Sequence, residues 1–542
     1  MTGFQSYYQY DAFDVGNVNI NTKLINLKIP LISYPQRGTL PSVDFWVNYS
    51  PSLWKYTCGS YCTWSPTSLR FGISFQQLLP YVGVARFHTD LHVQPVDYAY
   101  HAFDPTGAQH VLGWTSPTMM ESVDGSGFRF DGTNITDKNG ITYCWAQRGC
   151  VMRDPNGNAV TVDQQTGDTI DSVGRHLVGL NYSLLQPGCT TSSLLGPNGG
   201  TAPFTVCVST VNISTTFSWP VGSHQYIGSV NMITSIIRPN GTSWSFTYDN
   251  YGDLQSIGTP MGGTISFTYG SLSSTLGGGA PYYLLVSTRA VDAHDSSGAH
   301  SWSYSTTQSG QLMMTDPLGN DTVYTITHNG NQDIQSTNVD YYNGSHTNSS
   351  NLIKSDFTQN LVSGPNPFFY IDNNSSAYAA IPIYTTTIWA SGRVSKTCLL
   401  YDGLQNVPCA PIYSPGQIFT DNNPDGHGTQ YPFTYGSVIQ TSDYDFGNGA
   451  AGALLRQTNN QYLWQGNSNY QSANLLSLVS SSAILDSSGA QFAQTSYGYD
   501  ENNGSPQGVF GNETVGYAVA ERWHISGDEH SVRHARNANS KD

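Results

Sequence analysis

Two histidines and an aspartate alternate in the segment RFHTDLHV, at His88, Asp90 and His92. On a β-strand these three side chains would share one face, which is a plausible arrangement for two metal-binding imidazoles and a carboxylate. A polar, solvent-facing strand edge explains the same pattern, because Phe87 and Val93 remain available for packing. No further strong ligand is identifiable, so the polar edge is the simpler interpretation.

A second candidate metal site is the segment DNNPDGHGT, in which Asp421, Asn423 and Asp425 match the first half of a calcium loop. The acidic residue that would complete such a loop is missing, because the twelfth position is Pro432. Asp, Asn and Gly also favour tight turns without any ion. A turn is therefore the alternative, and the sequence predicts no resident cofactor.

Catalytic constellations are not recognisable in the sequence. Glycoside hydrolysis would need a carboxylate pair, but the chain has only 5 Glu among its 37 acidic residues, with none between Glu121 and Glu501. The histidine of the GHGT segment has no serine and aspartate in suitable contexts to form a triad. Tryptophans could stack on sugars, although core packing is their commoner role: Trp54, Trp64, Trp114, Trp145, Trp219 and Trp244. We therefore expect a protein that is not an enzyme.

Eight cysteines fall in four locally spaced pairs. Disulfides that close short loops are the first interpretation, and they would indicate an oxidising compartment. Buried free thiols are the alternative, whereas zinc is disfavoured because no Cys-x-x-Cys motif occurs. The candidate pairs are Cys58 with Cys62, Cys144 with Cys150, Cys189 with Cys207, and Cys398 with Cys409.

The composition indicates which elements must position these residues. The chain has 542 residues, 55 Gly and 35 Tyr, and its acidic residues are mostly Asp, which suits turns better than helices. The net charge of −16 comes without any basic run, so a nucleic-acid-binding surface is not expected. No stretch approaches the roughly 20 apolar residues of a membrane helix, and the first residues lack a signal-peptide pattern. An all-β protein with many tight turns is predicted.

Alternating patterns place strands in the first 225 residues. Val43, Phe45, Val47 and Tyr49 alternate with polar or aromatic neighbours, as in a half-buried strand. The segments DGSGFRF (124–130) and DPNGNAVTVD (154–163) each place a turn directly before a strand. We predict an N-terminal β-rich region over residues 1–225.

A repeat of about 21 residues follows from about residue 226. Pro239, Gly241, Phe246 and Tyr248 reappear as Pro260, Gly263, Phe267 and Tyr269. One such hairpin cannot bury its own apolar face, so neighbouring hairpins must continue one sheet. Other repeat-defining positions are Asp249, Asp316, Pro317, Gly319, Tyr324, Tyr444, Asp445, Tyr499 and Asp500. The repeat region is predicted over 226–520, and residues 521–542 form an atypical charged tail without a strand pattern. A solvated tail explains this change of composition, and a truncation or a frameshift is the other explanation.

The repeat segments resemble a known family. PNGTSWSFTYDNYGDLQSI, TDPLGNDTVYTI and SDYDFGNGAAGALLRQTNNQY resemble the YD repeats of bacterial Rhs proteins, which are related to toxin-complex C components and animal teneurins. The segments GNVNINTKLINLKIPLISYPQRG and VDFWVNYS resemble the N-terminal leader of these proteins. The resemblance covers about 226–515 for the repeats and about 15–50 for the leader.

The resemblance implies a fold, a role and partners. It implies that the YD-repeat hairpins form part of a spiralling β shell, a scaffold that encapsulates or presents a toxin or effector domain. The implied partners are a downstream effector or the remainder of the shell, and the implied location is secreted or at the cell surface. The alternative is an adhesin or carbohydrate-binding module that contacts cell-surface glycans through exposed aromatic residues.

Overall fold

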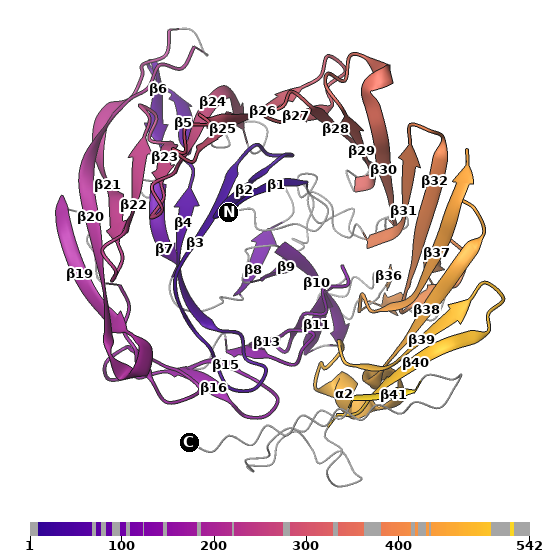
Figure 1. Ribbon diagram of the computed structural model, residues 1–542. Coiled ribbons are helices and arrows are strands. Elements are labelled where there is room, and N and C mark those ends of the chain that lie inside the picture. The colour runs from indigo at the N-terminus through magenta and orange to yellow at the C-terminus, as the bar shows by residue number, and fades with distance from the viewer. Residues whose placement is uncertain are drawn as a thin grey trace.

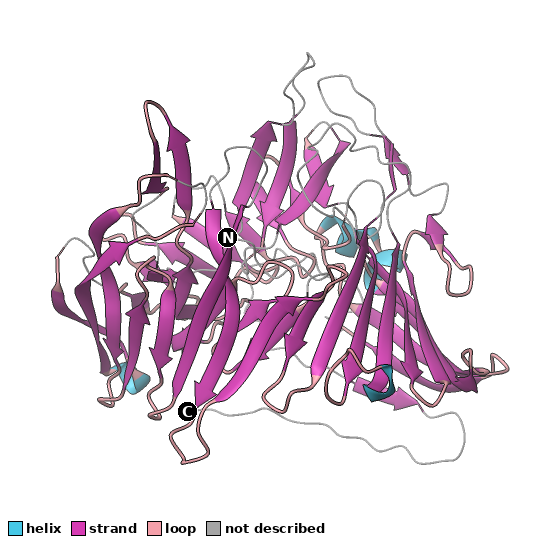
Figure 2. Cartoon of the chain, turned by 90° about the horizontal axis from the view of Figure 1, so that it is seen from above, coloured by secondary structure: helices cyan, strands magenta, loops and turns pink. Residues whose placement is uncertain are grey.

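Strands make up almost all of the regular structure of this protein (Figure 2). The structure is a computed structural model, and it describes residues 9–67, 72–76, 83–88, 98–104, 109–116, 118–122, 124–144, 149–180, 186–218, 222–274, 282–328, 334–361, 381–413, 418–420, 430–432, 435–499 and 521–524. The helical segments described are short: η1 (Pro197–Gly199), η2 (Ser349–Asn351), α1 (Leu463–Gly466) and α2 (Ser468–Ser472). The predicted all-β class is confirmed.

The first sheet is antiparallel and has five strands in the order β1-β2-β3-β4-β7. Alternation in the sequence explains its position, because Val43, Phe45, Val47 and Tyr49 on β4 are all buried. The strands are β1 (Tyr10–Phe13), β2 (Gly16–Asn19), β3 (Ile25–Tyr34), β4 (Val43–Ser50) and β7 (Gly72–Gln76). This sheet confirms the strands predicted near the N-terminus.

The second sheet has eleven strands, each paired with its neighbour along the chain from β8 to β18. Strands predicted after the turns of DGSGFRF and DPNGNAVTVD correspond to β12 and β16. Its strands are β8 (Gly83–His88), β9 (Tyr98–Phe103), β10 (Gln109–Ser116), β11 (Met119–Ser122), β12 (Arg129–Phe130), β13 (Asn134–Thr136), β14 (Thr142–Cys144), β15 (Cys150–Arg153), β16 (Ala159–Val162), β17 (Thr169–Ile170) and β18 (His176–Leu177).

The third sheet has 21 strands and contains most of the chain after residue 188. Its first part consists of β19 (Gly188–Leu195), β20 (Thr201–Ser214), β21 (Ile227–Ile237), β22 (Ser243–Tyr248), β23 (Leu254–Gly258), β24 (Thr264–Ser274), β25 (Tyr282–Asp292), β26 (His300–Thr306), β27 (Leu312–Thr315), β28 (Asp321–His328) and β29 (Ile334–Tyr342). It continues through β30 (Leu352–Leu361), β31 (Ile381–Trp389), β32 (Arg393–Tyr401), β37 (Val438–Asn448), β38 (Leu454–Tyr462), β39 (Val479–Asp486), β40 (Gln491–Tyr497) and β41 (Glu521–His524). We call this the long sheet.

Smaller elements complete the fold. The hairpin of β5 (Trp54–Cys58) and β6 (Cys62–Pro66) joins the long sheet, where Trp54 pairs with Tyr282 of β25. Two hairpins stand apart as two-stranded sheets: β33 (Leu404–Gln405) with β34 (Ile412–Tyr413), and β35 (Ile418–Thr420) with β36 (Gln430–Pro432).

One five-residue turn recurs in both the second sheet and the long sheet. At 249–253, the N–H of Asp249 donates to the carbonyl of Asp253 over 2.9 Å, and the N–H of Gly252 donates back to Asp249 over 3.0 Å. Gly252 has a φ of 81°, a conformation that favours glycine. The Asp249 carboxylate also accepts from the N–H groups of Tyr251 and Asp253. The same backbone pattern begins at Asp137, Asp154, Asp171, Arg238, Thr259, Thr307, Asp316 and Asp486.

The 21-residue step is visible in tyrosine contacts of the long sheet. The Tyr248 hydroxyl donates to the carbonyl of Ile233 over 2.6 Å, and the Tyr269 hydroxyl donates to that of Leu254 over 2.7 Å. Each tyrosine thus reaches 15 residues back along the chain, to a buried strand residue. The two units therefore have the same internal hydrogen bond.

One position of the predicted repeat is assigned differently by the structure. The glycine equivalent to Gly241 is Gly262 and not Gly263, because Gly241 and Gly262 both have a positive φ, 83° and 94°, and both donate to the first carbonyl of their turns. The predicted equivalence of Gly241 with Gly263 is therefore wrong by one residue, because two adjacent glycines cannot be told apart by residue type when only one of them has a positive φ. With Gly262, all four steps of the repeat are 21 residues.

The remaining repeat-defining residues are distributed over turns and strand ends. Pro239, Pro260, Pro317 and Gly319 lie in five-residue turns, whereas Phe246, Phe267 and Tyr324 are buried on strands. Tyr444 and Asp445 lie on β37, before a longer turn in which the Asp445 N–H donates to Ala453. Tyr499 is half-buried, and Asp500 lies outside the described residues.

The long sheet curves as an arc around the first sheet (Figure 1). It runs from β19 over β24–β28 to β38–β40, while β1–β4 lie on the inner side of the arc. One apolar core joins the two, since Val18, Ile29 and Val47 of the first sheet belong to the same buried cluster as Ile236 and Ile257 of the long sheet. Burial of apolar surface against the arc holds the first sheet in place.

The predicted charged tail contains one strand that the sequence does not indicate. Glu521–His524 forms β41, which pairs antiparallel with β40 from Tyr497–Glu521 to Gln494–His524. Pairing along a sheet edge uses backbone groups, so it does not require an alternating pattern of side chains. The predicted domain limits at 225 and 520 remain predictions, and the long sheet itself begins at Gly188.

Candidate functional site

The two candidate metal segments lie mostly beyond the described residues. Of the first, His88 is the last residue of β8 and its side chain is not described, and Asp90 and His92 lie outside the described residues. Asp421, Asn423 and Asp425 also lie outside them. Within the described part of the chain, no group of three or more His, Cys, Asp or Glu side chains is arranged to hold a metal ion.

The eight cysteines form four disulfides between the partners closest in sequence: Cys58–Cys62, Cys144–Cys150, Cys189–Cys207 and Cys398–Cys409. Strand pairing explains two of them, because Cys58 lies directly opposite Cys62 and Cys189 lies directly opposite Cys207. Disulfides persist in oxidising compartments, so the four bonds indicate that the protein works in such an environment. No helix of the described chain is long and apolar enough to cross a membrane.

Of the six tryptophans named above for sugar stacking, those whose side chains are described offer little surface, whereas Trp389 of β31, outside that set, is 39% exposed. Trp54, Trp64 and Trp244 are at most 8% exposed, and the first two belong to an aromatic cluster with Phe217 and Tyr282. The side chains of Trp114, Trp145 and Trp219 lie outside the described ones. For the three described residues, core packing is the role that the structure supports.

A histidine lies between two aspartates in the second sheet. The Nδ1 atom of His110 lies 2.6 Å from Oδ2 of Asp124, and Nε2 lies 3.7 Å from Oδ2 of Asp104. Burial alone would lower the pKa of His110, but the two carboxylates outweigh it and raise the pKa to about 10. Burial would raise the pKa of Asp124, but the charge of His110 holds it below its ordinary value. The ring is therefore an imidazolium at neutral pH, which makes it a structural cation rather than a general base.

We expect the His110 ring to remain protonated at about pH 8, well above the ordinary histidine pKa of about 6.5. Because the folded pKa is raised, the stabilisation is complete at low pH and is lost as pH rises through about 10. Nitrogen chemical shifts of the ring report the protonation state directly. Asp124→Asn should lower the titration midpoint, and a neutral ring in the wild-type protein at about pH 8 would contradict the assignment.

The first anchor between the first sheet and the long sheet is a buried ion pair. The Nη2 atom of Arg289 on β25 lies 2.7 Å from Oδ2 of Asp11 on β1, and the Arg289 side chain is 3% exposed. The Tyr304 hydroxyl donates to the same Asp11 oxygen, and Nε of Arg289 donates to Tyr304 over 3.2 Å. The guanidinium also stacks on the ring of Trp302, 3.9 Å from its centre. Each charged group thus has a specific partner.

The second anchor is a buried carboxyl group. Oδ1 of Asp253 accepts from the Tyr49 hydroxyl over 3.0 Å and from the Ser52 N–H over 2.9 Å. Tyr49 accepts in turn from the N–H of Leu254 over 3.1 Å. Burial, and then the nearby charge of Asp249, raise the pKa of Asp253 to about 8. The Tyr49–Asp253 contact spans 204 residues and ties β4 to the turn that precedes β23.

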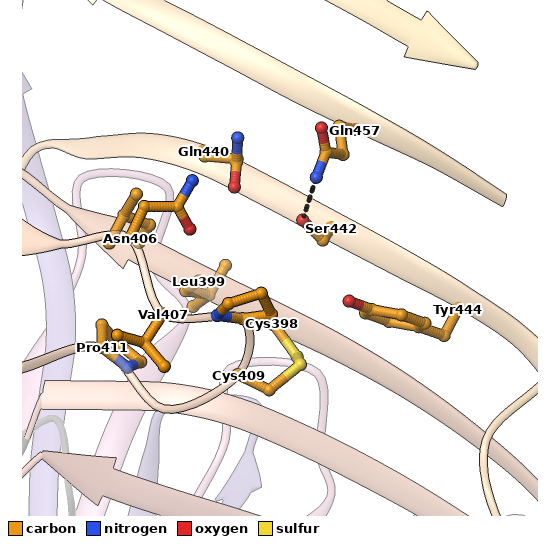
Figure 3. A pocket seen from close by; sticks show the side chains of 12 residues that line it. Cys398, Leu399, Asn406, Val407, Cys409, Pro411, Gln440, Ser442, Tyr444 and Gln457 are labelled. Atoms are coloured by element: carbon orange, nitrogen blue, oxygen red, sulfur yellow. Dashed lines mark hydrogen bonds between the residues drawn. A yellow bond between two sulfur atoms is a disulfide. The ribbon is translucent and has the colours of Figure 1, made fainter. Parts of the chain in front are cut away.

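A pocket lies over one face of β32, β37 and β38 (Figure 3). Gln440, Ser442 and Tyr444 alternate on β37, so their side chains share a face. Cys398 of β32 and Gln457 of β38 lie directly opposite Ser442 on either side. We call this site the β37 pocket.

The loop that follows β33 forms the other wall of the β37 pocket. Asn406, Val407 and Pro411 come from this loop, and the Cys398–Cys409 disulfide ties it to β32 (Figure 3). Cys409 has a φ of 55°, which is uncommon for a residue other than glycine. None of the described residues that line the pocket is charged.

Most of these sites are not evident from the sequence. Tyr444 and Cys398 are indicated there only as a repeat residue and a disulfide partner, and Arg289, Asp253 and His110 are not indicated at all. The sequence does contain one signal, which is the arginine Arg289 in the interior of YYLLVSTRAVD, a strand with no other charge before its last residue. A charge in such a strand requires a partner, although the sequence does not say which one.

Comparison with known proteins gives remote structural likeness only. No protein-family model matches the chain, and no curated protein matches it. A solved structure described as "Crystal Structure of TcdB2-TccC3-TEV" aligns at 9% identity over 88% of this chain and 22% of that chain, with a TM-score of 0.25. "Crystal Structure of TcdB2-TccC3" aligns at 9% identity over 95% and 28%, with a TM-score of 0.24. The chain thus spans about a quarter of their length, and the fold above rests on its own strand pairings.

Proposed function

We propose that this protein is a non-enzymatic scaffold that forms part of a β shell, which holds or presents a toxin or effector polypeptide. The observation that carries the proposal is the long sheet, in which 21 strands follow one another largely in chain order and curve around the first sheet. A strip of hairpins stabilised by contacts between neighbours forms a stiff wall, since each unit adds one more interface.

Two further observations support the proposal. The repeat segments resemble YD repeats, and the tyrosines of two successive units make the same hydrogen bond. Burial of Arg289 and Asp253 in contacts with the first sheet holds that sheet against the inner side of the wall. The partners would be an effector segment and the remainder of the shell, and the four disulfides suit a secreted or cell-surface location.

Adhesion to glycans through exposed aromatic residues is the second candidate function. The burial of Trp54, Trp64 and Trp244 weighs against it, because a ring must present an open face to stack on a sugar. The scaffold is therefore the function that we favour.

The scaffold proposal is tested with an unfolded reporter polypeptide fused after residue 542. A wall that holds the reporter should slow its cleavage by a protease by roughly tenfold relative to the same reporter on an unrelated soluble carrier, since cleavage follows the accessible population. The rate is measured by following the intact reporter over time. Equal rates on the two carriers would reject the shell.

The matched control is a variant that loosens the contact between the first sheet and the long sheet but leaves the long sheet in place. Arg289→Met is expected to loosen the first sheet, so it should restore part of the cleavage, whereas Arg456→Met at an exposed ion pair should not. Equal protection of the reporter in the wild type, Arg289→Met and Arg456→Met would mean that the size of the fused protein protects the reporter and not the arrangement of the sheets.

A further inference from the structure

The β37 pocket combines a polar floor with one aromatic ring. Nε2 of Gln457 donates to the Ser442 hydroxyl over 3.3 Å, and Nε2 of Gln440 donates to Asn459 over 3.0 Å. Both amide carbonyl oxygens therefore remain available as acceptors, and the Ser442 hydroxyl can still donate. The Tyr444 ring extends along the same face toward the disulfide (Figure 3).

Tyr444 differs from the repeat tyrosines that anchor neighbouring strands. Tyr248 and Tyr269 each donate their hydroxyl to a backbone carbonyl 15 residues earlier. The described residues offer no such hydrogen bond to the Tyr444 hydroxyl, although Tyr444 occupies the same Tyr-Asp motif. The Tyr444 side chain lines the pocket, and its hydroxyl is not used to hold neighbouring strands together. The hydroxyl and the ring are therefore available to a ligand.

The chemistry of the pocket selects an uncharged, hydroxyl-rich ligand. A phosphate, carboxylate or amine would need a charged partner or would lose its hydration without compensation, and the described lining supplies no charge. Amide and hydroxyl groups pair with the alternating donors and acceptors of a sugar ring. An aromatic ring suits the apolar C–H face of the same sugar.

We propose that the β37 pocket binds one pyranose ring of a neutral saccharide, with Tyr444 beneath the ring and Gln440, Ser442 and Gln457 on its hydroxyls. The wall that faces these residues depends on the Cys398–Cys409 disulfide, because this bond holds the loop of Asn406 and Val407 against β32. Reduction therefore releases the wall and weakens binding. The proposal does not rest on the scaffold role, since it needs only strands β32 to β38 and their loop.

Saturation-transfer NMR on the full chain tests the pocket with defined probes. The methyl glycosides of glucose, galactose and N-acetylglucosamine are used at about 10 mM, which detects dissociation constants in the millimolar range. At least one of the three is expected to give a signal, and glucuronate and glucosamine are expected to give none. A folded protein that gives no signal with any neutral pyranose overturns the proposal, as do equal signals from the charged sugars.

Variants locate the binding within the pocket. Tyr444→Ala and Gln457→Ala should each weaken binding about tenfold, the loss expected when one good contact is removed. Tyr61→Ala is the matched control, because Tyr61 is 67% exposed and lies on the hairpin of β5 and β6.

The double variant Cys398→Ser with Cys409→Ser should also lose binding. Circular dichroism establishes that each variant is folded, and a signal that survives in both Gln457→Ala and the cysteine variant assigns the sugar to another site and overturns the proposal.

Discussion

Replacement of Arg289 with methionine is expected to destabilise the contact between the first sheet and the long sheet by about 3–5 kcal/mol. The change removes the cation beside the Asp11 carboxylate, which is only 12% exposed. The carboxylate then keeps the hydrogen bond from the Tyr304 hydroxyl but has no positive charge to balance its own. Removing one partner of a buried ion pair costs more than the pair itself contributes, because the remaining charge keeps its desolvation penalty. The stacking of the guanidinium on Trp302 is lost as well.

Hydrogen exchange of the backbone is the measurement that resolves this effect. Peptides from β1 and β26 should exchange about 10²- to 10³-fold faster in Arg289→Met, since each factor of ten corresponds to about 1.4 kcal/mol. The distant strands β38 to β40 should not change. Uniform acceleration along the whole chain would mean that Arg289 supports the fold in general and not this contact.

Two control variants separate burial from charge. Arg456→Met removes an ion pair of similar length, 2.8 Å to Asp443, but the Arg456 side chain is 62% exposed, so the expected cost is below about 1 kcal/mol. Adding Asp11→Asn to Arg289→Met should recover part of the loss, because no charge is then left buried. No recovery in the double variant would assign the loss to packing instead.

Asp253 is expected to make the stability of the protein depend on pH in the direction opposite to most carboxylates. Burial and the charge of Asp249 raise its pKa from 3.8 to about 8 in the folded protein. The folded state therefore binds more protons than the unfolded state between these values, so stability is highest below about pH 4 and is lost as pH rises through about 8. At about 1.4 kcal/mol for each tenfold change in acidity, the full effect approaches about 6 kcal/mol.

Asp253→Asn should remove this dependence. The amide retains an oxygen that accepts from Tyr49 and Ser52, and it never ionises. The measured quantity is the difference in unfolding free energy between variant and wild type, from about pH 4 to about pH 9. We expect the two proteins to be similar at the acid end and the variant to gain several kcal/mol at the alkaline end.

A matched substitution controls for the amide itself. Asp131 lies in an exposed turn, where its carboxylate accepts from the N–H groups of Thr133 and Asn134. The difference between Asp131→Asn and wild type measures what the amide does at an exposed carboxylate, and only the pH dependence that Asp253→Asn shows beyond it is assigned to burial. A constant difference for Asp253→Asn would show that Asp253 is ionised throughout.

The sequence by itself determined the features that depend on neighbours in the chain. Alternation located β4, because residues on one face of a strand are buried together. Asp/Asn/Gly segments such as 154–157 located the turns, since the Asp carboxylate and the glycine φ fix the turn locally. Cysteine spacing indicated the four pairs because strands joined by short loops bring their residues face to face.

The tertiary structure alone decided which distant groups meet. Asp11 is 278 residues from Arg289, and Tyr49 is 204 residues from Asp253, so their contacts depend on the curvature of the long sheet around the first sheet. The β37 pocket likewise needs strands and a loop between residues 398 and 457 to share one face. Local patterns determine the strands and turns, because the interactions that stabilise them are made between residues close together in the chain. The curvature of a sheet is the sum of many small twists between strands, and no single segment of the sequence encodes that sum.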